Sequence, residues 1–226
     1  MSLSASSGTI IGKNNTLTFT VTRAGDGKIS VSSSNTSYAT ASVSGTTVTV
    51  TSKGYGTATI TVSVAAGTNH TAPSNKTYSV TVGYRYLYNN GTEYTDFTGA
   101  LTAIARALES GTSSKAPGIS KGTSSITVKQ NGNSTGTEGL CGVAYWANLI
   151  DLTNYSTLRV SGSFDGDAWS GIGVWSSMSG YVWDNMAAKS YTSGAIDISK
   201  LSGKYYIGFW VYYKGTSLSF SSVRLE

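Results

Sequence analysis

The fold is decided by the last stretch of the chain, residues 204–226, which reads KYYIGFWVYYKGTSLSFSSVRLE. In a β-strand, successive side chains point to opposite faces, so every second residue shares a face. One face of this run carries Tyr205, Ile207, Phe209, Val211 and Tyr213. The opposite face carries Tyr206, Gly208, Trp210 and Tyr212. The first face has the apolar residues of a sandwich core, whereas the second is aromatic with a glycine between its rings.

The aromatic face has two explanations. Either another sheet or loop covers it, or it is a platform for a flat amphipathic ligand such as a sugar ring. Beyond this run, the segment KGTS at 214–217 predicts a turn. Leu218, Phe220 and Val223 predict a returning strand, so the pattern indicates a C-terminal hairpin.

Composition and charge exclude several classes of protein. Charged residues make up 12% of the 226 residues, about half the usual share, which argues against a coiled coil and charge-driven disorder. The net charge of +5 divides into +4 for residues 1–83 (five Lys/Arg, one acid) and +1 for residues 84–226 (eleven Lys/Arg, ten acids). The lysines are scattered singly, so we expect no nucleic-acid partner. No apolar run is long enough for a spanning helix, so no membrane insertion is expected.

Three local features carry little functional information. Cys141 is the single cysteine and lies in an apolar run, so we expect a small buried side chain. His70 is the single histidine, and we expect it to be a solvated loop residue. The start, MSLSASSG, lacks the basic and apolar parts of a signal peptide. Either the chain acts without classical secretion or its leader lies outside this sequence.

Residues 1–83 consist of short alternating runs with turns between them. Apolar residues alternate with threonine or serine at 17–21, 58–64 and 78–82. Threonine suits the outward positions of a pleated, half-exposed sheet. Strands this short, with a turn every few residues, predict a β-sandwich.

Three phrases of this region resemble a known family. They are ATASVSG at 39–45, VTV at 48–50 and KGYGTATITV at 53–62. Together they resemble the bacterial immunoglobulin-like domain of group 2, over residues 3–83. The final turn, 67–73, is longer than in the shortest members, a variant found mainly in phage structural proteins. The resemblance implies a spacer or surface module and no chemistry.

Residues 84–226 predict a second domain after a linker of almost no length at Gly83-Tyr84. A strand at 84–88 is followed by NNG at 89–91, a strong turn signal. The segment 101–109 has helical spacing and alanines, but a strand is also compatible with it. Eight to ten strands are expected in all, which is the number a jelly roll needs.

A second resemblance rests on YLYNNG at 86–91, IDLTNYSTLRV at 150–160, and IDIS at 196–199 with YYIG at 205–208. These phrases resemble jelly-roll domains that follow immunoglobulin-like domains in tail and other virion proteins of phages infecting gut Firmicutes. Those domains are similar to carbohydrate-binding modules. The resemblance implies a glycan-facing role on a virion surface, and it favours a strand at 101–109. It fixes no binding residues.

Catalysis is not expected. A glycosidase needs two carboxylates facing each other across a cleft, whereas Asp165, Asp167 and Asp184 lie in predicted turns that explain them. His70 lies in the other domain, so no serine–histidine–aspartate set is expected. Asp165 and Asp167 are also a weak candidate for calcium, but the further spaced acids of a dedicated loop are missing. We therefore predict no cofactor, with calcium as the alternative.

Aromatic residues are the candidates for binding sugar. If Ile172 and Val174 face the core, Trp175 points outward, and the same alternation applies to Trp146 and Trp210. Exposed rings stack on the C–H faces of sugars, and neighbouring amides add hydrogen bonds. The alternative is that the rings fill a second layer or a subunit interface. The candidate carbohydrate-binding residues are Trp146, Trp175, Tyr181, Trp183, Asn185, Tyr206, Trp210 and Tyr212.

The sequence thus predicts an all-β chain, with an immunoglobulin-like β-sandwich at 1–83 followed by a jelly-roll β-sandwich at 84–226. The predicted function is a non-catalytic bacteriophage virion-surface module, in tail or capsid, that attaches to bacterial cell-surface glycans. The first domain is the spacer and the second the reader. The expected partners are a bacterial surface glycan and other virion proteins, with a homo-oligomer left open, and the expected location is the virion surface or extracellular space. The alternatives are a purely structural virion protein and an accessory carbohydrate-binding module of a secreted enzyme.

Overall fold

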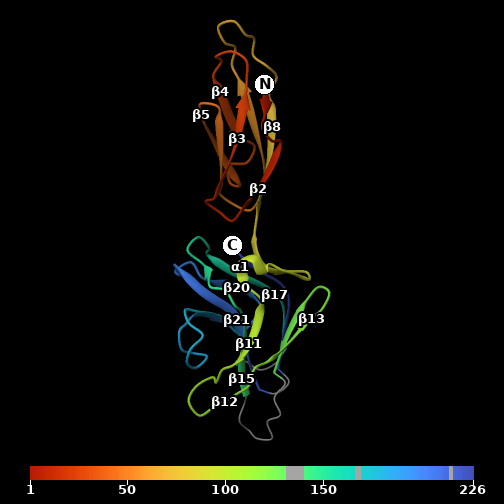
Figure 1. The fold of residues 1–226 in the computed structure, drawn as a ribbon, viewed down its shortest axis with the longest axis vertical. Coiled ribbons are helices and arrows are strands. Elements are labelled where there is room, and N and C mark those ends of the chain that lie inside the picture. Colours follow the sequence, from red (N-terminus) through yellow and green to blue (C-terminus); the bar gives the residue numbers. More distant parts are fainter. Residues whose placement is uncertain (131–139, 166–168, 214–215) are drawn as a thin grey trace. The chain divides into compact units, whose positions relative to one another are not determined.

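The computed structural model describes residues 1–130, 140–165, 169–213 and 216–226. They form an all-β chain of sheets packed as sandwiches, which confirms the predicted fold class (Figure 1). The chain divides into two compact units, Met1–Arg85 and Tyr86–Glu226. A single residue, Tyr84, separates the last strand of the first unit from the next strand. None of the helices in the described ranges is long and apolar enough to cross a membrane.

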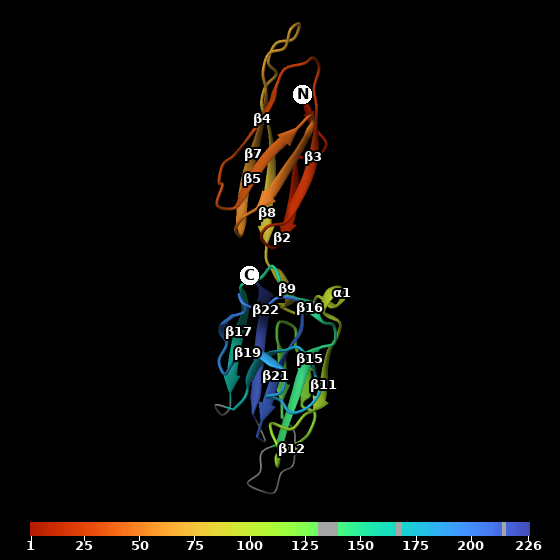
Figure 2. The ribbon, with the colours of Figure 1, turned by 90° about the vertical axis from the view of Figure 1, so that its left-hand side faces the viewer.

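The first unit is a sandwich of two four-stranded sheets (Figure 2). One sheet has the order β1 (Ser2–Leu3), β3 (Thr16–Thr22), β6 (Thr47–Ser52), β5 (Ala39–Ser44). The other has the order β2 (Ser7–Ile11), β8 (Lys76–Gly83), β7 (Gly56–Val64), β4 (Ile29–Ser33). The β2–β8 pair is parallel. Phe19 from the first sheet stacks on Tyr78 from the second, with ring centroids 4.2 Å apart.

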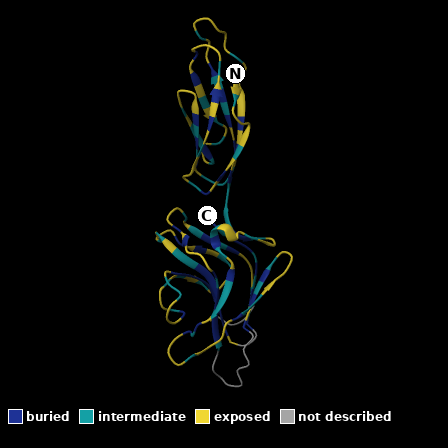
Figure 3. Cartoon of the chain, in the orientation of Figure 1, coloured by how far each residue is buried: buried dark blue, intermediate teal, exposed yellow. Residues whose placement is uncertain are grey.

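Alternation sorts the side chains of this unit between core and solvent, as Figure 3 shows by colour. The inward valines and isoleucines of β6 and β7 are fully buried. The outward positions are threonines and serines that face one another across the strands. Thr18 lies opposite Thr49, which lies opposite Ser42. The outer faces of both sheets therefore present hydroxyl groups, with few charges or rings.

The described residues of the second unit also form a sandwich of two sheets, each with seven strands. The first sheet contains β10 (Thr92–Glu93), β9 (Arg85–Asn89), β22 (Ser217–Leu225), β14 (Ile126–Lys129) and β13 (Gly118–Lys121) in that order, with β17 (Thr157–Asp165) joining β22 to β20 (Gly194–Asp197). The second sheet contains β11 (Leu101–Ala105), β15 (Leu140–Trp146), β21 (Lys204–Tyr212), β18 (Gly171–Trp175) and β19 (Met186–Ser190), with β12 (Ser113–Ser114) on β15 and β16 (Ile150–Asp151) on β21.

The predicted C-terminal hairpin is wrong. Strands β21 and β22 do not pair with each other, because β21 is a central strand of one sheet and β22 a central strand of the other. Their apolar faces meet across the core instead, where Phe209 and Phe220 stack with centroids 4.3 Å apart and planes 12° apart. Alternation fixes which face of a strand is apolar, but it does not fix whether two successive strands lie side by side or face to face. Residues 214–215 of the predicted turn lie outside the described residues.

A β-bulge in β22 explains why even-numbered residues face the core in its first half and odd-numbered residues in its second half. Ser161 of β17 lies opposite Ser222, and Gly162 lies opposite Phe220, so Ser221 is the extra residue. Leu218 and Phe220 face the core before the bulge, and Val223 and Leu225 face it afterwards. A bulge shifts the alternation by one residue in this way. Val223 lies on this strand, as the sequence predicted.

Two local predictions can be compared with the structure. Residues 101–105 form a strand, which confirms the predicted strand over that part of 101–109. Asn90 and Gly91 both have positive φ, 43° and 92°, and close a tight hairpin between β9 and β10, as the NNG signal predicts. The short helix α1 (Thr95–Thr98) was not predicted.

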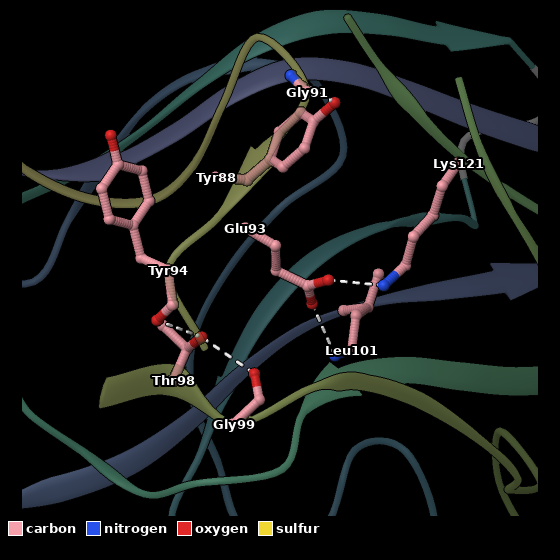
Figure 4. A network of polar contacts seen from close by, with 8 residues as sticks. All are labelled: Tyr88, Gly91, Glu93, Tyr94, Thr98, Gly99, Leu101 and Lys121. Atoms are coloured by element: carbon pink, nitrogen blue, oxygen red, sulfur yellow. Dashed lines mark hydrogen bonds and ion pairs between the residues drawn. The ribbon is translucent and has the colours of Figure 1, made fainter. Parts of the chain in front are cut away.

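A polar network connects the two sheets of the second unit at β10 (Figure 4). The Glu93 carboxylate accepts a hydrogen bond of 2.7 Å from the Leu101 amide, and it forms an ion pair with Lys121. The Thr98 hydroxyl is buried and bonds to the carbonyls of Tyr94 and Gly99 at 2.9 Å each. Glu93 thus holds strands β10 and β13 of one sheet to the start of β11 in the other.

The Phe209–Phe220 stack predicts a large stability effect. The substitution Phe220→Ala should lower the free energy of unfolding of the second unit by about 3–5 kcal/mol, because it leaves a cavity at the crossing of β21 and β22. All five tryptophans lie beyond residue 140, so tryptophan fluorescence during urea unfolding reports on this unit. Ile60→Ala, a core deletion in the first unit, should leave that fluorescence transition unchanged. A loss below about 1 kcal/mol for Phe220→Ala would contradict the face-to-face packing.

Candidate functional site

The outer, aromatic face of β21 is largely covered by a loop. Of the two explanations drawn from the sequence, coverage by another element therefore applies to most of this face. Trp210 and Trp175 have no exposed surface, and Tyr212 retains 9%. They form a second buried cluster, distinct from the core between the sheets, together with Leu108, Cys141, Val143 and Val182. The covering residues come from the segments that follow β11 and β18. Cys141 is fully buried, which confirms its predicted role.

Glycines make room for the two indoles on this face. Gly171, Gly173 and Trp175 share one side of β18, because they alternate along the strand. A Cβ atom on Gly171 would lie 2.7 Å from the Trp210 ring, and one on Gly173 would lie 2.5 Å from the Trp175 ring. Both distances are far below van der Waals contact. Each indole therefore lies close against the backbone of β18.

The covering loop between β18 and β19 is held by one buried side chain, Arg106, which is 3% exposed. Its Nε donates to the Gly180 carbonyl at 3.1 Å. Its Nη2 donates to the carbonyls of Ser179 and Asp184 at 2.7 and 3.0 Å. Three carbonyls of one loop thus converge on a single guanidinium, whose fork of donors suits such convergence.

The charge of Arg106 is satisfied by dipoles and a ring. None of the ion pairs between described residues involves it. Its guanidinium lies 5.9 Å from the centroid of the Trp175 ring, within the range of a cation–π contact. Burial lowers the pKa of the Arg106 guanidinium from its ordinary value, and the charges of Asp184 and Cys141 act in the opposite direction. An arginine nevertheless stays charged at neutral pH.

Further hydrogen bonds fix the loop against the sheet. The Trp175 indole N–H donates to the Val182 carbonyl at 2.8 Å, and the Val182 amide donates to the Ala107 carbonyl at 2.8 Å. The Asp184 carboxylate accepts the Tyr181 amide at 2.9 Å. Asp184 is thus a turn residue, as predicted. These hydrogen bonds hold the loop against the outer face of the sheet.

Three of the predicted sugar-stacking residues are wrong, because Trp146, Trp175 and Trp210 have no exposed surface. Trp175 and Trp210 do point to the outer face, but the loop covers them. Trp146 points the other way, into the core between the sheets, where it packs edge-on against Phe209 and Phe220. The reason is that Val143, on the opposite side of β15 from Trp146, belongs to the outer cluster.

The other predicted residues fall into different environments. Tyr212 is buried, and Tyr206 is half-buried with an edge contact to Tyr145 at 5.5 Å. Asn185 is exposed with a positive φ of 60°, and its amide donates to the Ser179 carbonyl at 3.4 Å. Tyr181 is 41% exposed. The weak calcium candidate, Asp165 and Asp167, lies outside the residues whose side chains are described.

On the outer face of the second sheet, two aromatic rings and a lysine among the described residues reach the surface together. We call this group the rim cluster, and it consists of Trp183, Lys189 and Tyr191. Trp183 is half-buried and Tyr191 is 38% exposed. Both rings meet the buried Trp210 edge-on, with centroids 5.6 Å away in each case. The Lys189 ammonium lies 4.2 Å from the Trp183 centroid and 5.3 Å from the Tyr191 centroid.

A shallow hollow lies beside the rim cluster. It has a volume of about 230 Å³ and is lined by Trp183, Met186, Ala187, Ala188 and Lys189. Trp169 is the most exposed tryptophan, at 51%, and its carbonyl accepts the indole N–H of Trp210. The hollow, the rim cluster and Trp169 are therefore all connected to one buried indole.

Sequence reasoning found Trp183 and missed Lys189, Tyr191 and Trp169. A signal for two of these was present, because alternation along 187–191 places Lys189 and Tyr191 on the same face of the strand. No sequence pattern marked Trp169, since the residues before it fall in a predicted turn. His70, in the first unit, is exposed as expected.

Comparisons with known proteins give little information about this site. No protein-family model matches the sequence, and no curated protein matches it. Two solved structures are similar at a TM-score of 0.29. One is the secreted serine protease VesC from Vibrio cholerae, 9% identical, covering 97% of this chain and 49% of the protease, so the chain spans about half of that protein. The other, from work on carbohydrate-binding modules of the β-sandwich superfamily, is 12% identical and covers 100% of this chain and 96% of that one. Likeness at this level carries no argument about the site, which rests on this chain's own residues.

The Arg106 clamp gives a testable prediction. Arg106→Met keeps the apolar stem and removes the donors, so it leaves three carbonyls without their partner. We expect a loss of about 2–5 kcal/mol in unfolding free energy and greater acrylamide quenching of tryptophan fluorescence. The control is Arg159→Met, which removes a half-exposed ion pair with Glu226 and should cost about 1 kcal/mol or less. Equal effects of the two substitutions would show that Arg106 does not hold the loop.

Proposed function

We propose that this chain is a non-catalytic glycan-binding protein whose second unit contacts sugar through the rim cluster. The observation that carries the proposal is that Trp183 and Tyr191 reach the surface beside a hollow while Trp210 fixes both rings from below. Rings held in place lose little conformational freedom when a ligand stacks on them. Amphipathic rings of this kind fit the apolar C–H face and polar edge of a sugar.

The size of the hollow supports a small ligand or one residue of a polymer. Its volume of about 230 Å³ is below the roughly 300–1,000 Å³ of pockets that enclose drug-sized molecules. The exposed Tyr181 and Asn185 lie on the same covering loop as Trp183 and add polar groups nearby. A polysaccharide passing over this surface would place one sugar in the hollow and others along the loop.

The chemistry of the acids favours binding over catalysis. Glu93 is occupied by Leu101 and Lys121, and Asp184 by the Tyr181 amide. Asp151 and Asp197 each accept the amide two residues further on, in turns. Hydrogen bonds to Thr153 and Ser199 lower the pKa of these two carboxyl groups, whereas a general acid needs a raised one. No cluster of three metal-ligating side chains occurs within the described ranges.

We further propose that the chain acts on the surface of a bacteriophage virion and attaches it to bacterial glycans. The support is the pair of sequence resemblances, in which an immunoglobulin-like domain precedes a jelly roll. The first unit suits a spacer, because its outer faces present threonine and serine hydroxyls and few groups that bind strongly.

A purely structural role in the virion is the second candidate. It is favoured by the complete burial of Trp146, Trp175 and Trp210, because these three indoles serve packing. In that case Trp169 and Tyr191 would contact another protein, as exposed aromatic rings often do. The two functions differ in whether isolated polysaccharide binds.

Substitution of Trp183 tests the proposal directly. Trp183→Ala should weaken binding to bacterial polysaccharides at least about tenfold, because it removes the central stacking ring. Glycan-array binding followed by titration calorimetry would measure this. Tyr94→Ala is the control, since Tyr94 is an exposed aromatic residue, at 40%, and lies outside the rim cluster. Binding that survives Trp183→Ala unchanged, or a wild type that retains no polysaccharide, would refute the proposed site.

A further inference from the structure

We propose that the rim cluster selects glycans that carry a negative charge, and that Lys189 reads this charge. The inference rests on the proposed function, because it names the class of saccharide for the same site. The ligand chemistry is a sugar ring with an attached anion, either a carboxylate or a phosphate. Trp183 or Tyr191 would contact the ring, and the Lys189 ammonium would contact the anion.

The Lys189 ammonium lies against two aromatic rings. A surface lysine normally samples many rotamers, and ordering it upon binding costs conformational entropy. Lys189 is exposed, yet its ammonium lies against Trp183 at 4.2 Å and within cation–π range of Tyr191 at 5.3 Å. Both rings are in turn held edge-on by the buried Trp210. In this arrangement the ammonium already lies beside both rings of the proposed site.

The positive charge of Lys189 suits an anionic ligand. The ion pairs between described residues join Lys121 to Glu93, and Arg159 and Arg224 to Glu226, and Lys189 takes part in none of them. The acid of the covering loop, Asp184, accepts the Tyr181 amide and lies near the charge of Arg106. A cation–π contact leaves the positive charge of Lys189 in place. This charge at the hollow is complementary to an anion.

The positions of Lys189 and Trp183 allow both to contact one ligand. Lys189 lines the same hollow as Trp183, together with Met186, Ala187 and Ala188. The two alanines are small, and the Lys189 ammonium lies 4.2 Å from the centroid of the Trp183 ring. A sugar seated there has its apolar face toward carbon atoms and its anionic substituent within reach of the ammonium. A neutral sugar gains only the first of these contacts, and it also competes with Lys189 for the Trp183 ring.

The test compares matched ligands on the full chain. Polygalacturonate supplies the carboxylate, its carboxyl-reduced form is the neutral partner, and a phosphomannan, whose phosphate is attached to a sugar ring, supplies the phosphate. A bacterial glycan array extends the comparison to other neutral and acidic glycans. We expect wild type to bind one of the acidic classes better than neutral glycans by about three- to tenfold, and we expect added salt to remove the difference.

The decisive variant is Lys189→Gln. It should lower binding of the acidic glycan by about three- to tenfold while leaving neutral binding unchanged or raised, because the Trp183 ring is uncovered. Lys53→Gln, an exposed lysine of the first unit, makes the same change in net charge and should have no effect. Trp183→Ala should weaken both kinds of glycan.

The outcomes separate this inference from the proposed function. If Trp183→Ala weakens binding but Lys189→Gln changes neither the acidic nor the neutral affinity, glycan binding stands and charge selection is wrong. Charge selection is also wrong if Lys53→Gln has as large an effect as Lys189→Gln, because net charge then explains the preference. If wild type binds no glycan of either class, both proposals fall.

Discussion

Strand β21 is buried on both of its faces, and the rest of the second unit is arranged to make this possible. Its inner face packs through Phe209 onto Phe220 of the opposite sheet. Its outer face carries Trp210, which a single sheet would leave in water. The covering loop supplies the missing layer, and Arg106 fixes that loop by three carbonyl hydrogen bonds. Burying an arginine is costly unless its donors are occupied, so the loop and the arginine depend on each other.

This arrangement decides which aromatic rings are available to a ligand. Trp210 is buried and cannot contact a ligand. It still supports the surface residues Trp183 and Tyr191, because both rings pack edge-on against its ring. The rim cluster is thus the outer layer of a hydrophobic cluster, and its rings are held by packing rather than by the backbone of a free loop. Binding sites supported in this way are rigid before the ligand arrives. The proposed glycan site and the stability of the cover are therefore two properties of one group of residues.

The sequence predicted the all-β fold and the alternation of two faces along residues 204–212, because both follow from a period of two. It placed Tyr213 on the core face, whereas Tyr213 lies beyond β21 and is exposed. It did not predict that β21 and β22 lie in different sheets, since a period of two says nothing about the partner of a strand. The parity of Trp146 was misjudged for a related reason. Val143 and Trp146 are both apolar, so alternation alone could not tell the outer cluster from the core. Trp175 and Trp210 were placed on the correct face but not under their cover, which depends on the long-range contact between Arg106 and the loop at 178–184. The sequence did not indicate a role for Lys189 and Tyr191, because their place beside Trp183 and Trp210 depends on the tertiary structure.

Hydrogen exchange of the five tryptophan indole N–H groups, followed by NMR, tests the central claim most directly. The account predicts strong protection for Trp175 and Trp210, whose indoles are buried and hydrogen-bonded, and for Trp146 in the core. It predicts fast exchange for Trp169, which is half exposed. Exchange of the Trp175 and Trp210 indoles as fast as that of Trp169 would show that the outer face of β21 is open to water, and the account of the cover and of the rim cluster would be wrong.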